Sequence, residues 1–230
     1  MTPRHAIVTG IFGADYWRIA DVSIPSIRAY ANRIGAELVV LEQRQFPKWH
    51  PYWEKLGVGR LLVGYDAVAW IDLDTIVNPA APDIFQELHP CGFSAFDEGR
   101  VFVDRAEQLV KDAEFYDLEN VVTRIRSFSY FNVGVMVASR AVRSLFNPPR
   151  EAKSSSIMPE QTYLNLRLIE TGFPFHDLTS KWNGLHSIHK TTADRKDLNI
   201  VHYAGWPRTP DWVDLMTRQM LVDKANWQAG

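Results

Sequence analysis

Short apolar runs alternate with segments of helical periodicity along most of the chain. Runs rich in β-branched and aromatic residues predict strands, and apolar residues at three- and four-residue spacing predict helices between them. The predicted strands are 5–12, 36–42, 67–74, 91–98, 129–139, 173–178 and 199–205. The predicted helices are 20–35, 52–65, 82–88, 104–118, 159–172 and 211–226. Strands that alternate with helices indicate one α/β domain with a largely parallel sheet.

Glycine and proline mark several boundaries of these elements. Gly35 follows an apolar stripe as a C-cap, and Pro159 and Gly172 bound a later helix. The segments 43–51 and 146–158 carry no periodic pattern and are predicted as loops. The second loop is a candidate lid over an active site.

Composition and charge fit a globular protein. The 230 residues are 46% hydrophobic and 23% charged, which suits one domain with a buried core and a concave site. The formal net charge of −2 gives no global basic field for nucleic acid. Cys91 is the single cysteine, which excludes an internal disulfide and fits a reducing compartment. No run reaches the ~18 apolar residues that span a bilayer, so we expect a cytoplasmic protein without a transmembrane segment.

Two carboxylates stand at the end of the apolar run AVAWIDLDTIV, residues 67–77. Side chains alternate along a strand, so Asp72 and Asp74 are expected to point the same way. Two carboxylates this close raise each other's pKa unless a cation lies between them, and Mg²⁺ and Mn²⁺ prefer such oxygen ligands. Ligand sites of α/β sheets lie beyond the carboxyl ends of strands, where this pair falls. The pair predicts a divalent metal site, with a solvated Asp-x-Asp turn as the alternative.

A phosphatase is a second interpretation of the same pair. An apolar strand followed by Asp-x-Asp resembles the nucleophile strand of haloacid-dehalogenase-type phosphatases, in which Asp72 would form an aspartyl-phosphate. In that family the motif lies near the N-terminus and continues Gly-Thr, whereas here Thr75 and Ile76 follow it. A nucleotidyltransferase is disfavoured, because no glycine-rich phosphate loop with a lysine occurs near the N-terminus.

Three further motifs follow the carboxylate pair, and they are YFNVGVMVAS (130–139), PEQTYLNLRL (159–168) and HYAGWPRTP (202–210). Together with the Asp-x-Asp they resemble metal-dependent GT-A-fold glycosyltransferases of family 8, which include glycogenin and bacterial lipopolysaccharide α-galactosyltransferases. The resemblance covers nearly the whole chain. It implies an α/β fold with a mixed, mostly parallel central sheet flanked by helices. It also implies a nucleotide-binding half at 1–78 and an acceptor and donor-sugar half at 79–230.

The resemblance further implies a metal centre and a phosphate clamp. Asp72, Asp74 and His202 match residues that bind Mn²⁺ (or Mg²⁺), and the ion holds the diphosphate of a nucleotide-sugar donor. Gly205 would let backbone approach the phosphates, and Arg208 stands where the family has lysine. The implied donor is UDP-linked, either UDP-glucose or UDP-galactose.

Four residues match the nucleotide side of the family's donor site. Lys55 matches a basic residue that reaches the donor sugar and diphosphate, and Arg60 is the competitor for that position. Thr9 and Gly10 would lie against the base, and Tyr16 would stack on uracil.

Other matches concern the sugar and the acceptor. Asn132 matches an asparagine that contacts the donor sugar, Glu160 stands where the family has aspartate, and Gln161 matches the residue beneath the sugar. Asn165 matches a later asparagine of the same motif. Asp97 would face the acceptor. Each of these residues also has a structural alternative. Asn132 would be a strand asparagine bonded to neighbouring backbone, and Asp97 would be a turn carboxylate. An exposed helix face would account for Glu160, Gln161 and Asn165.

The implied chemistry is hexosyl transfer with retention of configuration. Gln161 is a poor nucleophile for a double displacement, so we expect front-face attack in which the departing phosphate oxygen takes the acceptor's proton. In an inverting alternative, Asp97 or Glu98 would act as general base. Trp182 and Asn183 lie in a loop suited to sugar contacts. The acceptor is left open between a glycan, a small molecule, a protein and a modified base, and a non-catalytic binder of nucleotide-sugar or carbohydrate is a further alternative.

Overall fold

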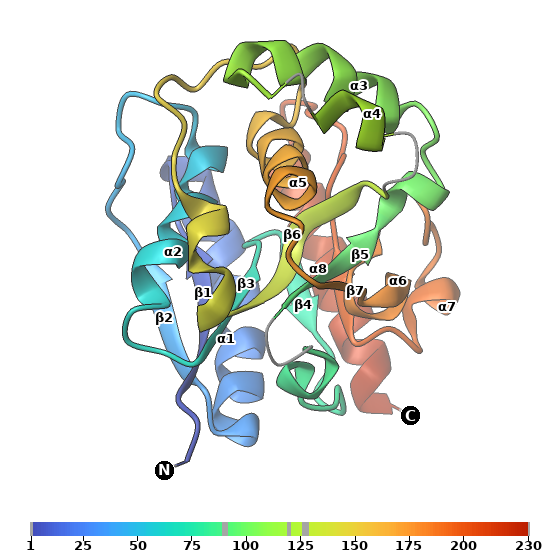
Figure 1. Ribbon diagram of the computed structural model, residues 1–230. Helices are drawn as coiled ribbons and strands as arrows, with labels where there is room; N and C mark the ends of the chain where they lie inside the picture. The colour runs from blue at the N-terminus through green and yellow to red at the C-terminus, as the bar shows by residue number, and fades with distance from the viewer. Residues whose placement is uncertain (1, 89–91, 119–120, 126–128, 230) are drawn as a thin grey trace.

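A six-stranded sheet forms the centre of the molecule (Figure 1). The computed structural model describes residues 2–88, 92–118, 121–125 and 129–229, so Cys91 lies outside the described residues. The strands of this sheet are β1 (His5–Gly10), β2 (Glu37–Leu41), β3 (Ala67–Ile71), β5 (Phe93–Asp97), β6 (Phe131–Ser139) and β7 (Phe175–Asp177). Their order is β2-β1-β3-β6-β5-β7, and among these strands only β6 runs antiparallel to its neighbours. The predicted mixed, mostly parallel sheet is confirmed.

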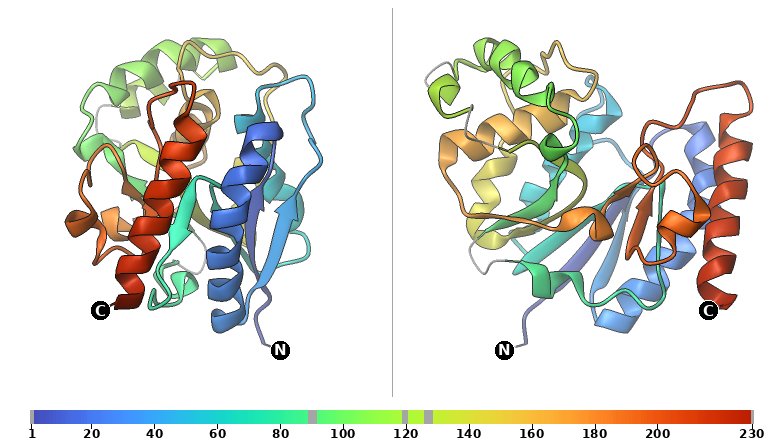
Figure 2. Two further views of the ribbon diagram at one scale, coloured as in Figure 1. Left: turned by 180° about the vertical axis from the view of Figure 1, so that it is seen from behind. Right: turned by 90° about the vertical axis from the view of Figure 1, so that its right-hand side faces the viewer.

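Helices cover both faces of the sheet. Figure 2 shows α1 on one face with α8 beside it, and α5 on the opposite side of the strands. Strand side chains alternate between the two layers, so that Val68 and Trp70 enter the core beneath α5 while Ala69 and Ile71 enter the core beneath α1. The α-helices are α1 (Ala14–Ile34), α2 (Val58–Leu61), α3 (Arg105–Ala113), α4 (Val122–Ile125), α5 (Pro159–Thr171), α6 (Thr179–Trp182), α7 (Thr192–Arg195) and α8 (Trp212–Ala229). The 3₁₀-helices are η1 (Pro51–Gly57), η2 (Ile84–Glu87), η3 (Glu98–Arg100), η4 (Glu114–Tyr116) and η6 (Arg140–Phe146).

A second, three-stranded sheet brings the last strand to the carboxylate pair. It consists of β4 (Thr75–Val77), β8 (Gly184–Leu185) and β9 (Ile200–His202) in the order β4-β9-β8. The strand predicted at 67–74 is therefore corrected, because β3 ends at Ile71 and the chain turns before β4 begins. After this turn the backbone bonds to β9 instead of β6, and the Tyr203 N–H donates to the Asp74 carbonyl at 2.8 Å.

The helix predicted at 52–65 is also corrected. The chain there forms η1 followed by the single turn of α2. Two glycines of this segment let other segments approach closely. A Cβ on Gly57 would lie 2.3 Å from Gln45 Nε2, and one on Gly59 would lie 2.8 Å from Phe146 Cβ.

The other predicted helices are present with shifted ends. The helix predicted at 20–35 begins earlier, at the start of α1, and Gly35 ends it in the left-handed region as predicted. The segment 82–88 is the 3₁₀-helix η2, and 104–118 divides into α3 and η4. The remaining two correspond to α5 and α8. Within the described residues, none of the helices combines the length and apolar character needed to cross a bilayer.

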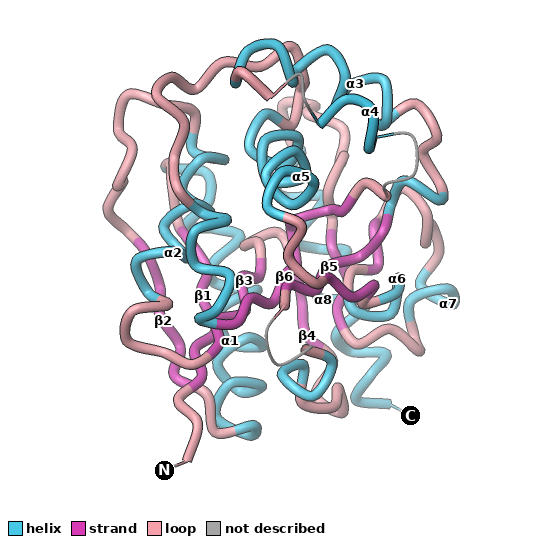
Figure 3. Tube along the Cα trace, viewed as in Figure 1, coloured by secondary structure: helices cyan, strands magenta, loops and turns pink. Residues whose placement is uncertain are grey.

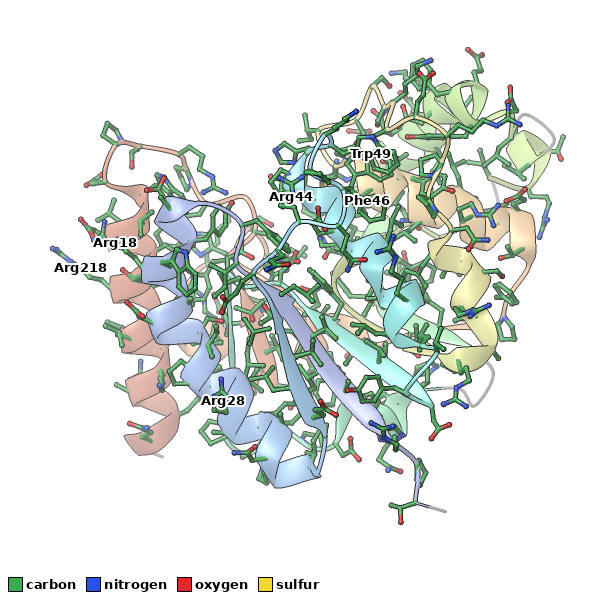
Figure 4. The ribbon with its side chains drawn as sticks, turned by 90° about the vertical axis from the view of Figure 1, so that its left-hand side faces the viewer. Arg18, Arg28, Arg44, Phe46, Trp49 and Arg218 are labelled. Carbon is green, nitrogen blue, oxygen red and sulfur yellow. The ribbon has the colours of Figure 1, made fainter. Side chains whose placement is uncertain are left out.

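The two predicted loops extend along the rim of the molecule above the strands (Figure 3). The first, 43–51, is bonded to the fully buried Glu54 of η1, which accepts from Arg44 Nε at 2.7 Å and from the backbone N–H groups of Gln45 and Phe46 at 2.7 and 3.0 Å. Figure 4 shows Arg44, Phe46 and Trp49 gathered in this loop, and the two aromatic rings stack with centroids 5.0 Å apart. A buried carboxylate therefore holds this loop in place.

A carboxylate also fastens the second loop, 146–158. Asp112 of α3 is fully buried and accepts from the Ser155 N–H and hydroxyl at 2.9 and 2.7 Å. The lid function of this loop stays a prediction.

A buried ion pair connects α7, α8 and the residue after β9. Arg195 and Asp223 are 1% and 2% exposed, and their side chains meet at 2.6 Å. Asp223 also accepts from the Tyr203 hydroxyl at 2.7 Å, and Arg195 donates to the His189 carbonyl at 2.8 Å. Because Tyr203 directly follows His202, this pair anchors one side of the carboxylate cluster.

Asp223→Ala is expected to lower the free energy of unfolding by roughly 3–5 kcal/mol, because it leaves the buried Arg195 guanidinium without its carboxylate. Urea unfolding followed by circular dichroism measures this change. The control is Glu151→Ala, which removes the exposed partner of Lys153 and is expected to leave the midpoint unchanged. Equal stability of Asp223→Ala and wild type would contradict the anchoring role.

Candidate active site

The carboxyl ends of β1 and β3 open into a cavity of about 470 Å³. Because β6 runs antiparallel to β3, its first residues lie at the same edge, and the Asp72 N–H donates to the Gly134 carbonyl at 2.7 Å. The first turn of α5 contributes further side chains. The predicted site residues that line this cavity are Gly10, Tyr16, Lys55, Asp72, Asp74, Asn132, Glu160, Gln161, His202, Gly205 and Arg208.

Asp72, Asp74 and His202 form a group that can hold a metal ion. One ligand atom of each residue lies within 4.8 Å of the others. His202 Nε2 is 3.3 Å from Asp74 Oδ1 and 3.7 Å from Asp72 Oδ2. Trp70 Nε1–H donates to Asp72 Oδ1 at 2.6 Å, and Leu73, between the two carboxylates, packs in the core. Two carboxylate oxygens and one imidazole nitrogen suit Mn²⁺ or Mg²⁺, so the donor set fits the predicted metal.

The charges of these three side chains depend on one another. Burial raises the pKa of Asp72, and Lys55 and His202 offset this only in part. Burial also acts to raise the pKa of Asp74, but the neighbouring His202 outweighs it and the pKa is lowered. Burial lowers the pKa of His202, whereas the two carboxylates raise it, and the net shift is upward. A divalent cation between the carboxylates would relieve their repulsion.

Lys55 stands beside the carboxylate pair. Its Nζ is 3.0 Å from Asp72 Oδ2 and 3.0 Å from Glu160 Oε1. Burial lowers the pKa of Lys55, but these two carboxylates outweigh burial and raise it, so the ammonium is charged. Arg60 is exposed and does not line the cavity. The structure therefore brings Lys55, and not its competitor, into the site.

Asn132 and Gln161 belong to a buried hydrogen-bond network. Asn132 Nδ2 and Gln161 Nε2 donate to the two oxygens of Glu98 at 2.7 and 2.8 Å. Gln161 Oε1 accepts from the Val133 N–H at 3.2 Å, and Arg105 Nε lies 3.3 Å from Glu98 Oε1. Glu98 does not line the cavity. It orients the two amides that do.

Thr9 and Asp97 lie outside the cavity lining. Thr9 is fully buried within β1. Asp97 accepts from the Gly99 N–H at 3.2 Å and from Arg100 Nε at 3.0 Å. The predicted acceptor-facing role of Asp97 is therefore corrected, because both of its oxygens hold the turn after β5.

Three further candidates support the site from behind. Asn165 Oδ1 accepts from the Phe131 N–H at 2.7 Å, and Asn165 Nδ2 donates to the Phe131 carbonyl at 2.8 Å. Trp182 belongs to the core beneath α1. Asn183 is fully buried, and its Oδ1 is 2.8 Å from His202 Nδ1. The expected sugar contacts of Trp182 and Asn183 are corrected, since neither side chain lines the cavity.

Aromatic and cationic groups also line the cavity. Gly205 has a φ of 75°, in the left-handed region, and its backbone borders the cavity. The Arg208 guanidinium lies 3.7 Å from the ring centroid of Trp212 and donates to the Tyr16 hydroxyl at 3.4 Å. Stacking on Trp212 therefore holds Arg208 beside Tyr16.

Sequence reasoning missed several lining residues. Trp70 could have been found, because strand alternation places it on the same side as Asp72. Nothing in the sequence marks Gly134 as a lining residue, because its place in the site comes from its closeness to Asp72 and His202, which belong to other segments. The other missed residues are Phe12, His50, Pro51, Tyr52, Leu73, Met158 and Ala204.

Known proteins resemble this chain in structure. No protein-family model matches the chain, and no curated protein matches its sequence. A glycosyltransferase involved in glycosylation of the major capsid of PBCV-1 matches with a TM-score of 0.65 and 14% identity, over 96% of this chain and 100% of that chain. The WbbM bifunctional glycosyltransferase matches with a TM-score of 0.61 and 16% identity, over 100% of this chain and 51% of that chain. The galactosyltransferase LgtC, in complex with donor and acceptor sugar analogues, matches with a TM-score of 0.56 and 16% identity, over 94% and 95%. The chain has the GT-A glycosyltransferase fold.

The GT-A fold confirms the predicted fold class and the structural resemblance to family 8, which includes LgtC. At 14–16% identity the likeness shows the fold alone. The activity is therefore argued from the site. The phosphatase alternative requires a different fold and finds no support in these matches.

Gly134→Ala is expected to weaken Mn²⁺ binding to the GT-A domain by about tenfold or more, the scale of damage to a metal ligand's surroundings. A Cβ at this position would lie 2.1 Å from His202 Cε1 and 3.0 Å from Asp72 Oδ2, so the ligands must move. Isothermal titration calorimetry measures the affinity. The control is Gly64→Ala, whose nearest heavy atom is 3.7 Å away. Unchanged Mn²⁺ affinity in Gly134→Ala would contradict this placement of the metal.

Mn²⁺ affinity is expected to fall as the pH is lowered through the raised pKa of His202. An imidazolium has no free lone pair for a metal. Mn²⁺ can therefore bind His202 only when the ring loses the proton that Asp72 and Asp74 stabilise. The decline should begin above pH of about 6.5, the ordinary histidine pKa, because the shift is upward. Titrations at several pH values, each in two buffers of different ionisation enthalpy, measure affinity and proton release together. A constant affinity without proton release would argue against His202 as a ligand.

Proposed function

We propose that this protein is a metal-dependent glycosyltransferase that moves a hexose from a nucleotide-sugar donor to an acceptor hydroxyl. A UDP-linked donor, UDP-glucose or UDP-galactose, and retention of configuration belong to the proposal. The observation that carries it is the Asp72, Asp74 and His202 cluster, which shares one cavity with Lys55 and Gln161 in a GT-A fold.

Positive charge at one end of the cavity would neutralise the departing diphosphate. When bound by Asp72, Asp74 and His202, Mn²⁺ or Mg²⁺ would supply a Lewis acid for diphosphate oxygens. Lys55 adds a fixed ammonium 3.0 Å from Asp72 Oδ2. Arg208 adds a guanidinium that is able to bind a phosphate through two N–H groups.

Buried polar groups at the first turn of α5 would bind the sugar. Glu160 Oε1 pairs with Lys55, whereas Oε2 is buried and has no hydrogen-bond partner among the described residues. An unpaired buried acceptor is costly, so a donor-sugar hydroxyl is a suitable partner. Asn132 and Gln161 stand nearby with their amides fixed by Glu98.

The position of Gln161 supports front-face transfer. A carboxamide is a poor nucleophile, and both polar atoms of this one are already bonded, to Glu98 and to the Val133 N–H. The departing phosphate oxygen would therefore accept the proton of the attacking hydroxyl. Asp97 and Glu98, the bases of the inverting alternative, do not line the cavity, which favours retention.

Separate functions for the two halves of the chain are part of this proposal. Residues 1–78 would bind the nucleotide, and residues 79–230 the donor sugar and acceptor. The acceptor class is open among a glycan, a small molecule, a protein and a modified base. A cytoplasmic location stays a prediction.

Nucleotide-dependent thermal stabilisation tests the proposal. With Mn²⁺ present, one of UDP, GDP or their sugar conjugates is expected to raise the melting temperature. Ligand at a hundred times its Kd adds about 2.7 kcal/mol, or roughly 5–10 °C for a domain of this size. EDTA and the Asp74→Asn substitution should each abolish the shift. Asp66→Asn is the control, because Asp66 is an exposed carboxylate paired with Arg140 at 3.2 Å.

Sugar release and transfer then separate the alternatives. Slow Mn²⁺-dependent hydrolysis of the stabilising nucleotide-sugar, lost in Asp74→Asn, would support a transferase over a non-catalytic binder. No stabilisation by any nucleotide would overturn the proposed function. Phosphate release from a phosphomonoester without nucleotide would instead favour the phosphatase alternative.

A further inference from the structure

A continuous chain of buried hydrogen bonds leads from the metal cluster to the interior beside β5. His202 Nδ1 is 2.8 Å from Asn183 Oδ1, Asn183 Nδ2 is 2.8 Å from Asn132 Oδ1, and Asn132 Nδ2 is 2.7 Å from Glu98 Oε2. None of these four side chains is more than 5% exposed. They come from four segments that are distant in sequence, so the chain of bonds exists only in the folded protein.

The backbone fixes the direction of every bond in this chain. The Gly134 N–H can only donate, and it lies 2.9 Å from Asn132 Oδ1, which identifies that atom as the amide oxygen. The Asn183 atom facing Asn132 Oδ1 must then be its NH₂ group, so Asn183 presents its oxygen to His202. An oxygen can only accept, and therefore His202 Nδ1 carries the proton.

We propose that Asn183 is a positioning residue that sets the metal ligand and a sugar-side amide at once. It holds His202 with a proton on Nδ1, so that in the neutral ring Nε2 is the unprotonated nitrogen and faces Asp74 and Asp72. Through its NH₂ group it also holds the amide of Asn132. The inference rests on the proposed function only where it names a metal as the partner of Nε2, because the tautomer follows from the hydrogen bonds themselves.

Glu98 anchors the far end of the same network. Its second oxygen accepts from Gln161 Nε2 at 2.8 Å and lies 3.3 Å from Arg105 Nε. One carboxylate therefore orients Gln161 directly, and orients His202 through Asn132 and Asn183. This arrangement links the metal side of the cavity to its sugar side.

Two substitutions of similar size separate the functions of Asn183. Asn183→Asp keeps an oxygen for His202 Nδ1–H but places a second oxygen against Asn132 Oδ1. Asn183→Leu removes both partners. The first readout is the tautomer of His202 in the metal-free protein, measured from side-chain ¹⁵N shifts at alkaline pH, where the ring is neutral. His202→Gln identifies the signal. The second readout is the affinity for Mn²⁺ alone, measured from the paramagnetic resonance of the free ion.

The expected result is a proton on Nδ1 in wild type and in Asn183→Asp, and its redistribution in Asn183→Leu. Mn²⁺ affinity should fall about 10- to 100-fold in Asn183→Leu, and by less in Asn183→Asp. A proton on Nε2 in wild type, or an unchanged tautomer and affinity in Asn183→Leu, would overturn the inference. If the leucine variant does not fold, the wild-type tautomer and the aspartate variant decide the question.

The His202 tautomer tests the role of Asn183, and Mn²⁺ binding tests the proposed function, so either claim can fail without the other. A wild-type protein that holds the proton on Nδ1 but binds no Mn²⁺ supports the positioning role of Asn183 and counts against the proposed function. A protein that binds Mn²⁺ with the proton on Nε2 supports the metal site and overturns the role of Asn183.

Discussion

The antiparallel pairing of β6 with β3 is the constraint on which the site depends. In a wholly parallel sheet the carboxyl ends of the strands would face only the loops that follow them. Here β6 begins where β3 ends, so Asn132 and Gly134 lie beside Asp72. The short second sheet completes the arrangement, because β9 pairs with β4 immediately after Asp74 and delivers His202 to the carboxylates.

Charge and burial explain why this edge of the sheet is suited to a ligand. Two carboxylates, a lysine and a histidine line one cavity; His202 and each carboxylate shift each other's pKa, and Lys55 acts on all three. Such a group is costly to bury unless its charges are balanced. The ion pairs of Lys55 provide part of the balance, and a divalent cation with a diphosphate would complete it. Behind this layer, the neutral amides of Asn132, Asn183 and Gln161 are all satisfied, which fixes their orientation without adding charge.

Local sequence patterns predicted secondary structure well where the conformation of a segment depends only on its own residues. The strand runs, the C-caps at Gly35 and Gly172 and the helix beginning at Pro159 all follow from neighbouring residues, and all are present. The helix predicted at 52–65 is a 3₁₀-helix followed by one α-turn that ends at Leu61, and its glycines contact Gln45 and Phe146, which lie outside that segment. The strand predicted at 67–74 ended early because β9, far along the chain, takes over its hydrogen bonding.

The sequence by itself determined the fold class and most of the residues around the cavity. The motif order and the resemblance to family 8 predicted that Asp72, Asp74 and His202 lie together, although the strand expected to run through both aspartates ends at Ile71. Tertiary structure alone decided which polar residues touch the cavity and which support it. Asp97, Glu98 and Asn183 are indistinguishable from ligand-binding residues in the sequence, because a buried carboxylate or amide looks the same whatever its partner. Only the folded chain supplies those partners, and the hydrogen bonds show that Asp97, Glu98 and Asn183 hold neighbouring groups rather than line the cavity.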